Sequence, residues 1–153
     1  MEIDTSLIGA STAPYVIAVE RGEIRRFAQA IGDSNPLWLD RDFARSHGYD
    51  DVIAPPTFPV SFQMPGIPIW WEGLDRKRFL AGEHRFSYVR PIGVGDVLTC
   101  RMTLTDVEHK EGRSGRMDLM LQEVRGVDQG GAEVFSHRRI TVYRGAGNAL
   151  RGS

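Results

Sequence analysis

Leu98-Thr99-Cys100-Arg101-Met102-Thr103-Leu104 alternates apolar and polar side chains with a period of two residues. Because successive side chains of a strand point to opposite faces, this alternation predicts a β-strand with one apolar face. The same period occurs earlier in the chain, where His84, Phe86 and Tyr88 are expected to share one face of a strand. The second half of the chain is therefore predicted to form a sheet.

Two turn-forming stretches divide the chain beyond residue 104. Residues 111–115 and 126–131 are rich in Gly, Asp and Ser, which favour tight turns. They separate an apolar stretch at residues 117–121 from another at residues 134–143. Strands joined by short turns pair antiparallel, so this half is predicted to be an antiparallel meander.

The first half predicts a short strand and then a helix. Residues 15–19 form a β-branched, apolar run, and Gly22 is expected to break the chain after it. Gly32 is placed to end the helix. The helix is indicated by one apolar stripe at positions i, i+3, i+4 and i+7, which consists of Ile24, Phe27, Ala28 and Ile31.

Two shorter helices are also predicted. Asp40 can cap a helix of about two turns that ends at Gly48. Thr57 can cap a segment through Met64, where Pro59 lies in the first turn and Pro65 prevents continuation. A sheet of about five strands with one apolar face needs a cover, and only the first half has apolar helical stripes. We therefore expect one α+β domain over residues 1–153, with a core at about 15–143 and the sheet wrapped around a short helix.

Composition excludes several classes of protein. Lys and Arg number 19 and Asp and Glu 20, so the formal charge of -1 argues against a nucleic-acid or membrane-surface protein. The single Cys100 cannot form an intrachain disulfide or a cysteine zinc site. The chain opens with an acidic stretch rather than a signal peptide, and prolines interrupt its longest apolar runs. The expected location is the cytoplasm, with no membrane span.

Three stretches together resemble a known family. Gly32-Asp33-Ser34-Asn35-Pro36-Leu37-Trp38-Leu39-Asp40 reads on its own as a loop with a rigid Asn-Pro turn. It also resembles the Gly-Asp-x-Asn-Pro-aliphatic-His-x-Asp motif of MaoC-like dehydratases and (R)-specific enoyl-CoA hydratases. Ile53-Ala54-Pro55-Pro56-Thr57-Phe58 and Arg90-Pro91-Ile92-Gly93-Val94-Gly95-Asp96 resemble two further family motifs. The chain looks most like the N-terminal-half (FAS1-like dehydratase) type, which implies a hot-dog fold with a central helix.

The resemblance implies reversible addition of water to a trans-2-enoyl thioester, with no cofactor apart from the coenzyme A of the substrate. In the family an Asp and a His hold the water, and the His serves as the base. Asp33 matches the Asp, but Trp38 replaces the His, and an indole is only a hydrogen-bond donor. The resemblance therefore implies that Asp33 is vestigial or only orients water.

A second departure concerns the oxyanion donor, which the family provides as a backbone N–H after Pro55. Pro56 stands there and has no N–H, which leaves Thr57 as a possible donor. Two losses favour a substrate-holding subunit paired with an Asp/His-bearing MaoC-like partner. A self-sufficient homodimer that uses Asp33 with His47 or a group of the twin chain, and an acyl-CoA binding module without catalysis, remain alternatives. Dimerisation is expected in all three cases.

Further candidate residues have a structural and a functional interpretation each. Trp70 and Trp71 fit core packing, an acyl tunnel or a subunit contact, and Arg76 and Arg78 fit a solvated loop or a site for CoA phosphates. His47 fits a helix cap or a substitute base. The spacing of His84, His109 and His137 gives no support to a metal site. Pro59 and Pro65 shorten the central helix, from which we expect a roomy tunnel for bulky acyl groups. The expected substrate-binding residues are Asn35, Pro56, Phe58, Trp70, Trp71, Arg76 and Arg78.

Overall fold

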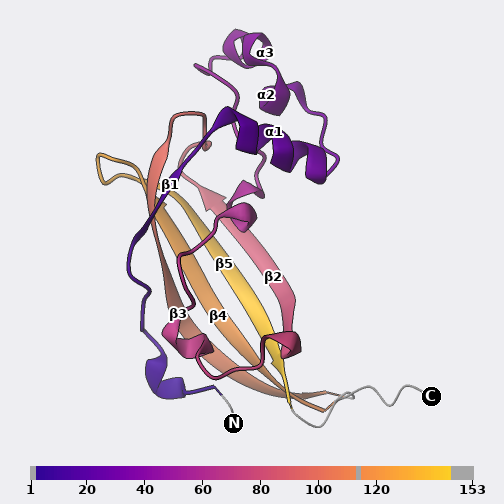
Figure 1. Ribbon diagram of the computed structural model, residues 1–153, viewed down its shortest axis with the longest axis vertical. Helices are drawn as coiled ribbons and strands as arrows, with labels where there is room; N and C mark the ends of the chain where they lie inside the picture. The colour runs from indigo at the N-terminus through magenta and orange to yellow at the C-terminus, as the bar shows by residue number, and fades with distance from the viewer. Residues whose placement is uncertain (1–2, 113–114, 146–153) are drawn as a thin grey trace, which may run out of the picture.

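The computed structural model, which describes residues 3–112 and 115–145, is built on one five-stranded antiparallel sheet. Its strand order is β1-β3-β4-β5-β2 (Figure 1). The predicted α+β fold is therefore confirmed. The strands are β1 (Tyr15–Ala18), β2 (Phe79–Tyr88), β3 (Val97–Gly112), β4 (Gly115–Val127) and β5 (Glu133–Arg144).

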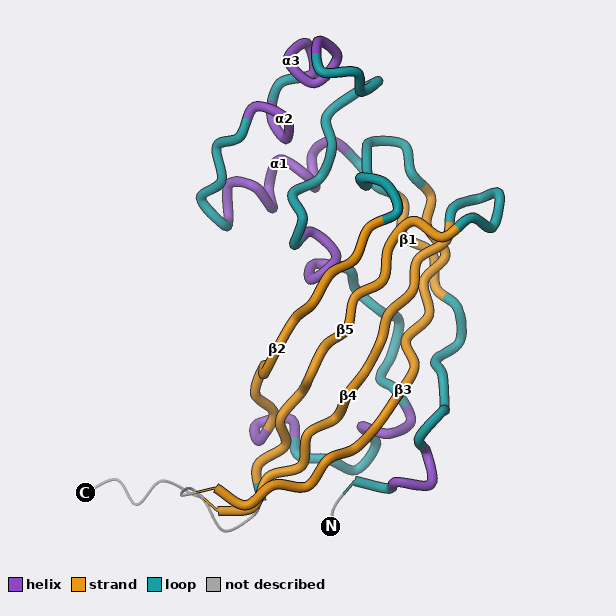
Figure 2. The backbone as a smooth tube through the Cα atoms, turned by 180° about the vertical axis from the view of Figure 1, so that it is seen from behind, coloured by secondary structure: helices purple, strands orange, loops and turns teal. Residues whose placement is uncertain are grey.

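The α-helices gather beyond one end of the sheet, as Figure 2 shows from behind. The four 3-10 helices lie in the segments that precede β1 and β2. Within the described residues no helix is long and apolar enough to cross a membrane. The helices are α1 (Arg21–Ala30), α2 (Pro36–Leu39), α3 (Arg41–Ser46), η1 (Thr5–Leu7), η2 (Phe58–Ser61), η3 (Ile69–Trp71) and η4 (Arg76–Arg78).

The alternation that predicted the sheet is confirmed on β3. Its four alternate side chains from Leu98 to Leu104 are all buried, whereas Thr99 and Arg101 are exposed. The turn predicted at 126–131 closes with Gly131, whose φ of 81° suits glycine. Gly112 and Gly115 pair across the other predicted turn, and the two residues between them lie outside the described residues.

The first helix is confirmed with two corrections. Ile24 and Ala28 are fully buried, and Gly32 follows the helix with a φ of 70°. Gly22 does not break the chain, because α1 begins at Arg21 and the glycine lies in its first turn. Ile31 is not part of the buried stripe: it is the C-cap and 47% of its surface is exposed, since the helix ends before it.

The second predicted helix is α3, which Asp40 caps as expected by accepting hydrogen bonds from the amides of Asp42 and Phe43. The stretch between α1 and α3 is not only a loop. Asn35 caps a further short helix, α2, through a bond of 3.0 Å from the amide of Leu37 to Asn35 Oδ1. Pro36 supplies a favourable first helical residue.

The helix predicted over Thr57–Met64 is shorter than expected. Only the 3-10 helix η2 forms, and Phe62 is already extended. Pro59 is compatible with the first helical turn, whereas Met64 precedes Pro65 and therefore disfavours the α conformation, so the segment does not continue as a helix to Met64. The chain from residue 56 to 78, which we call the covering segment, then runs along one face of the sheet (Figure 1). The sheet face that it covers is called the inner face.

Candidate functional site

The loop after α1 holds Asp33 in a fixed turn. The Asp33 amide donates to the Ala28 carbonyl over 2.9 Å, which completes the end of the helix. Its Oδ1 accepts from the Asn35 amide over 3.0 Å, and the side chain is half-buried. Asp33 therefore orders the turn that leads into α2. Its structural partner is the Asn35 amide, and Asn35 itself serves as a helix cap.

Trp38 lies on α2 and is buried, with 8% of its surface exposed. Its Nε1 is inaccessible and has no hydrogen-bond partner among the described residues. A buried donor without a partner is unfavourable by about 1–3 kcal/mol. The indole therefore occupies the motif position of the family's His with a donor that nothing in the described chain satisfies.

The entry to the covering segment places three further candidates close to α1. Pro56 and Thr57 are exposed, and Phe58 is buried with its ring edge-to-face on Phe27 at 5.5 Å. The carbonyl of Pro56 accepts a hydrogen bond from the hydroxyl of Tyr88 on β2. The Thr57 amide has no partner among the described residues, so it is free to donate to a ligand. Leu37 of α2 joins this region to the first motif by accepting from the Ile53 amide.

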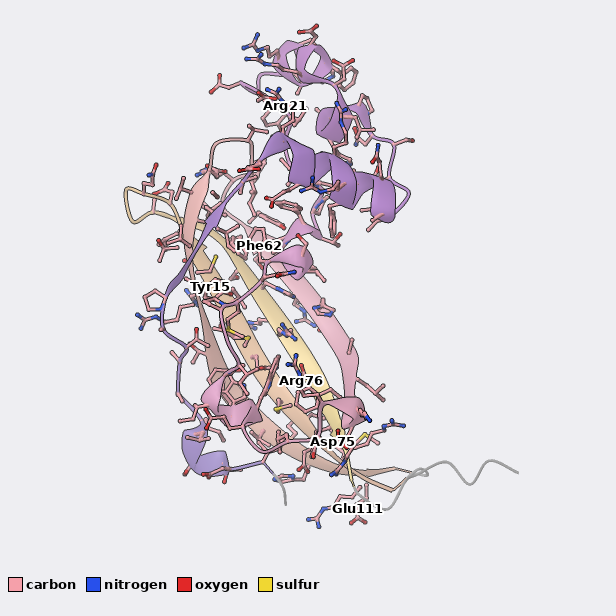
Figure 3. The ribbon with its side chains drawn as sticks, in the orientation of Figure 1. Tyr15, Arg21, Phe62, Asp75, Arg76 and Glu111 are labelled. Carbon is pink, nitrogen blue, oxygen red and sulfur yellow. The ribbon has the colours of Figure 1, made fainter. Side chains whose placement is uncertain are left out.

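The remaining candidates lie toward the other end of the sheet. Trp70 and Trp71 are buried in the core, and Trp70 Nε1 donates to Gln122 Oε1 over 3.0 Å. Arg76 is exposed in η4, and Figure 3 shows it far from Arg21 and the α-helices. Arg78 donates to the Arg144 carbonyl and stacks over a tyrosine ring. The structure therefore does not bring these residues together with Asp33.

Two of the histidines considered above, and Arg90 of the third motif, have local partners. His47 is the C-cap of α3, where its Nδ1 lies 2.9 Å from the Phe43 carbonyl. Arg90 makes two hydrogen bonds to Asp96. His109 Nδ1 lies 2.6 Å from Asp118. Within residues 3–112 and 115–145 no group of three metal-ligating side chains occurs.

A cluster of polar side chains on the inner face was not predicted from the sequence. His84 on β2 places its Nδ1 2.8 Å from Nε2 of His137 on β5, and Arg139 lies directly opposite His84 in the strand register. We call these three residues the inner-face cluster. The register of two strands more than fifty residues apart brings them together, and period-two alternation within each strand was the only signal for it.

The inner-face cluster lines a pocket of about 240 Å³ between the sheet and the covering segment. Tyr15 and Phe62, both labelled in Figure 3, contribute to its apolar wall. Burial lowers the pKa of His137 to about 4, aided by the neighbouring His84 and Arg139. Burial also lowers the pKa of Arg139. The pocket thus combines apolar walls with the polar side chains of the inner-face cluster.

A five-stranded antiparallel sheet with its helices at one end and an Asp-x-Asn-Pro turn capping one of them defines a hot-dog protein of the MaoC-like dehydratase class. The family described as FAS1-like, dehydratase domain region, matches residues 6–137. The chain belongs to this family.

Relatives of the chain extend over nearly its full length. A protein of Thermobifida fusca named only "UPF0336 protein" is 39% identical over 150 residues, which cover 95% of this chain and 96% of that protein. A solved MaoC-like dehydratase is 27% identical with a TM-score of 0.79, and the match covers 92% of this chain but 43% of that one. One chain of the C-terminally truncated HadBC (3R-hydroxyacyl-ACP dehydratase) complex from Mycobacterium tuberculosis shares the fold, with 23% identity, a TM-score of 0.73 and coverage of 93% and 99%.

Proposed function

We propose that this chain is the substrate-holding subunit of an enoyl thioester hydratase or dehydratase and that a MaoC-like partner with an Asp/His pair carries out the chemistry. The observation that supports this most strongly is Trp38, a buried indole at the motif position of the catalytic His. Water addition needs a proton acceptor, and an indole N–H only donates. Coenzyme A enters as part of the substrate, and no other cofactor is required.

Asp33 fits a structural role in this proposal. Its carboxylate accepts from the Asn35 amide and so stabilises the turn before α2. His47, which the sequence offered as a substitute base, donates its Nδ1 proton to the Phe43 carbonyl at the C-terminal end of α3. His47 Nε2 can still accept a proton, but Asp33 and His47 share no hydrogen bond among the described residues, so they do not form the Asp/His pair that holds one water in the family reaction. This favours the paired subunit over a self-sufficient homodimer.

The Thr57 amide provides a means of holding the thioester. It is exposed at the start of η2 and has no partner among the described residues. An N–H at the beginning of a helical turn is suited to a carbonyl oxygen that gathers negative charge. We propose that Thr57 takes the place that Pro56, with no N–H, leaves empty.

The partner subunit is supported by the sheet and by the relatives. β2 is a ten-residue edge strand whose outer edge is unpaired within the described residues. Such an edge invites pairing with another chain. Among the relatives, HadBC is a complex of two kinds of chain, and the solved MaoC-like dehydratase is more than twice as long as the matched region. We propose that β2 forms the partner interface.

The proposal is tested by reconstitution with a MaoC-like chain that carries the Asp/His pair. Hydration of a trans-2-enoyl-CoA is followed for each chain alone and for the mixture. We expect the mixture to exceed the sum of the separate rates by at least about tenfold. Asp33→Ala in this chain is expected to change the kcat of the mixture less than about threefold, whereas Ala at the partner's Asp abolishes turnover.

Two results would select another function. Turnover by the isolated chain that Asp33→Ala abolishes would establish the self-sufficient homodimer. Binding of the enoyl-CoA without any turnover in the presence of Asp/His-bearing partners would establish a binding module.

A further inference from the structure

Arg139 is a half-buried cation on the inner face, and no counterion contacts it among the described residues. Its Nε is inaccessible, and the guanidinium forms no hydrogen bond or ion pair within residues 3–112 and 115–145. Its guanidinium carbon lies 5.5 Å from the centroid of the Trp71 ring. A buried donor without a hydrogen-bond partner is unfavourable, and the charge it carries adds to that cost. The folded chain therefore keeps an unfavourable group at Arg139 on β5.

The groups around Arg139 do not neutralise it. His84 and His137 lie beside it and share one hydrogen bond, so one of the two rings donates and the other accepts. Both rings have a lowered pKa because of burial, and both are therefore uncharged near neutral pH. Tyr15 is the other titratable side chain of the pocket, and burial raises its pKa to about 12. None of the described residues that line the pocket carries a carboxylate.

We propose that Arg139, with the two histidines, binds a carboxylate carried by the acyl part of the substrate. A guanidinium binds a carboxylate through two parallel hydrogen bonds, and a neutral imidazole offers one further N–H. A ligand with a negative charge offsets the desolvation penalty of the Arg139 guanidinium. The same ligand forms charge-assisted hydrogen bonds with that guanidinium. The chain thereby selects carboxylated acyl groups over plain hydrocarbon chains.

The remaining lining of the pocket favours an acyl carboxylate over an inorganic anion. Besides the inner-face cluster, its walls are formed mainly by apolar side chains of the sheet and the covering segment, namely Tyr15, Pro59, Val60, Phe62, Met64, Met102 and Val124. Such a surface suits methylene groups and disfavours a fully hydrated ion. Arg139 and His84 also line a neighbouring pocket beside Trp71, so the cluster is reachable from two sides. The inference that the ligand is a CoA thioester rests on the proposed function. The inference that the pocket binds a carboxylate does not.

The test compares two ligands that differ only at the end of the acyl chain. Binding of an ω-carboxy trans-2-enoyl-CoA and of its methyl-terminated analogue of equal length is measured by calorimetry on the full chain. We expect the carboxylated ligand to bind at least about tenfold more tightly. Arg139→Met should reduce this preference to about twofold or less, and Arg139→Lys should leave it intermediate because the planar fork is lost.

Arg138→Met is the matched control, because Arg138 is exposed and its side chain points to the opposite face of β5. It should retain the full preference. Arg139→Met should also raise the melting temperature of the ligand-free chain, because it removes an unpaired buried charge. The gain in stability accompanied by the loss of selectivity distinguishes a binding site from a folding defect.

Binding of free heptanedioate, a dicarboxylate without a thioester, tests the carboxylate site independently of the proposed function. If neither CoA ligand binds but heptanedioate stabilises the wild type and not Arg139→Met, the carboxylate site stands and the proposed function fails. Equal binding of the two CoA ligands by the wild type would overturn the site, as would a preference that persists in Arg139→Met. The absence of any binding, including heptanedioate, would also overturn it. A preference lost on adding the partner would show that a carboxylate of the partner occupies the site, and would overturn it too.

Discussion

His137 is buried and uncharged in the folded chain, which makes stability depend on pH. Its pKa is lowered to about 4, against about 6.5 for an ordinary histidine. Between these values the unfolded chain binds a proton that the folded chain excludes. The free energy of unfolding should therefore fall as the pH drops from 6.5 to 4, by about 3 kcal/mol for this residue.

Urea unfolding at pH 7 and at pH 4.5 measures this loss. His137→Phe should remove most of the histidine-dependent part, whereas His47→Gln, at the exposed end of α3, should retain it. The interpretation fails if the wild type and His137→Phe lose the same stability over this range.

At the level of single residues, the sequence predicted which functional groups are present better than it predicted which neighbours surround them. The replacement of His by Trp38 and the missing N–H of Pro56 follow directly from the motif positions. The orphan Nε1 of Trp38 and the uncompensated charge of Arg139 do not, because a missing partner depends on every neighbour in the fold. Trp70, Trp71 and Phe58, which the sequence predicted to bind substrate, are buried in the core.

The pairing of β4 with β5 depends on a close contact between Gly126 and Phe135. A Cβ atom added at Gly126 would lie 2.1 Å from the fully buried Phe135 ring. Gly126→Ala should therefore force the ring to move and destabilise the chain by about 2 kcal/mol or more. Gly130→Ala, in the turn between the same strands, meets its nearest atom at 3.4 Å and should change stability by less than about 1 kcal/mol.

Chemical denaturation of the two variants gives this comparison directly. Equal loss of stability in Gly126→Ala and Gly130→Ala would show that the ring accommodates the extra atom.

Strongly periodic elements could be predicted and short ones could not. The alternation on β3 and the apolar stripe of α1 each extend over several residues, so local pattern agrees with tertiary burial. α2 has four residues and depends on the Asn35 cap, and η2 is a single 3-10 turn that ends where the chain becomes extended at Phe62. The inner-face cluster requires the register of β2 on β5, which no local pattern specifies.

For the whole molecule, the unpaired edge of β2 is the expected contact with the partner. Leu80 lies on this strand with 47% of its surface exposed, so a charge there should be tolerated by the isolated fold. Leu80→Asp should weaken the complex with the Asp/His-bearing partner at least about tenfold, because charges on an edge strand oppose pairing.

Val16→Asp is the control, since Val16 is 64% exposed on β1 at the opposite edge of the sheet. It should change the dissociation constant less than about threefold. Similar weakening by both variants, measured by calorimetry or size-exclusion chromatography, would place the interface elsewhere.

The assignment of the chemistry to a partner depends on the lack of a proton acceptor beside Asp33. The most direct measurement is the hydration rate of a saturating trans-2-enoyl-CoA with the purified chain alone, monitored through loss of the conjugated thioester absorbance. We expect a rate indistinguishable from that of buffer. Sustained turnover at rates ordinary for enzymes, on the order of one per second or faster, would contradict the division of labour between two subunits.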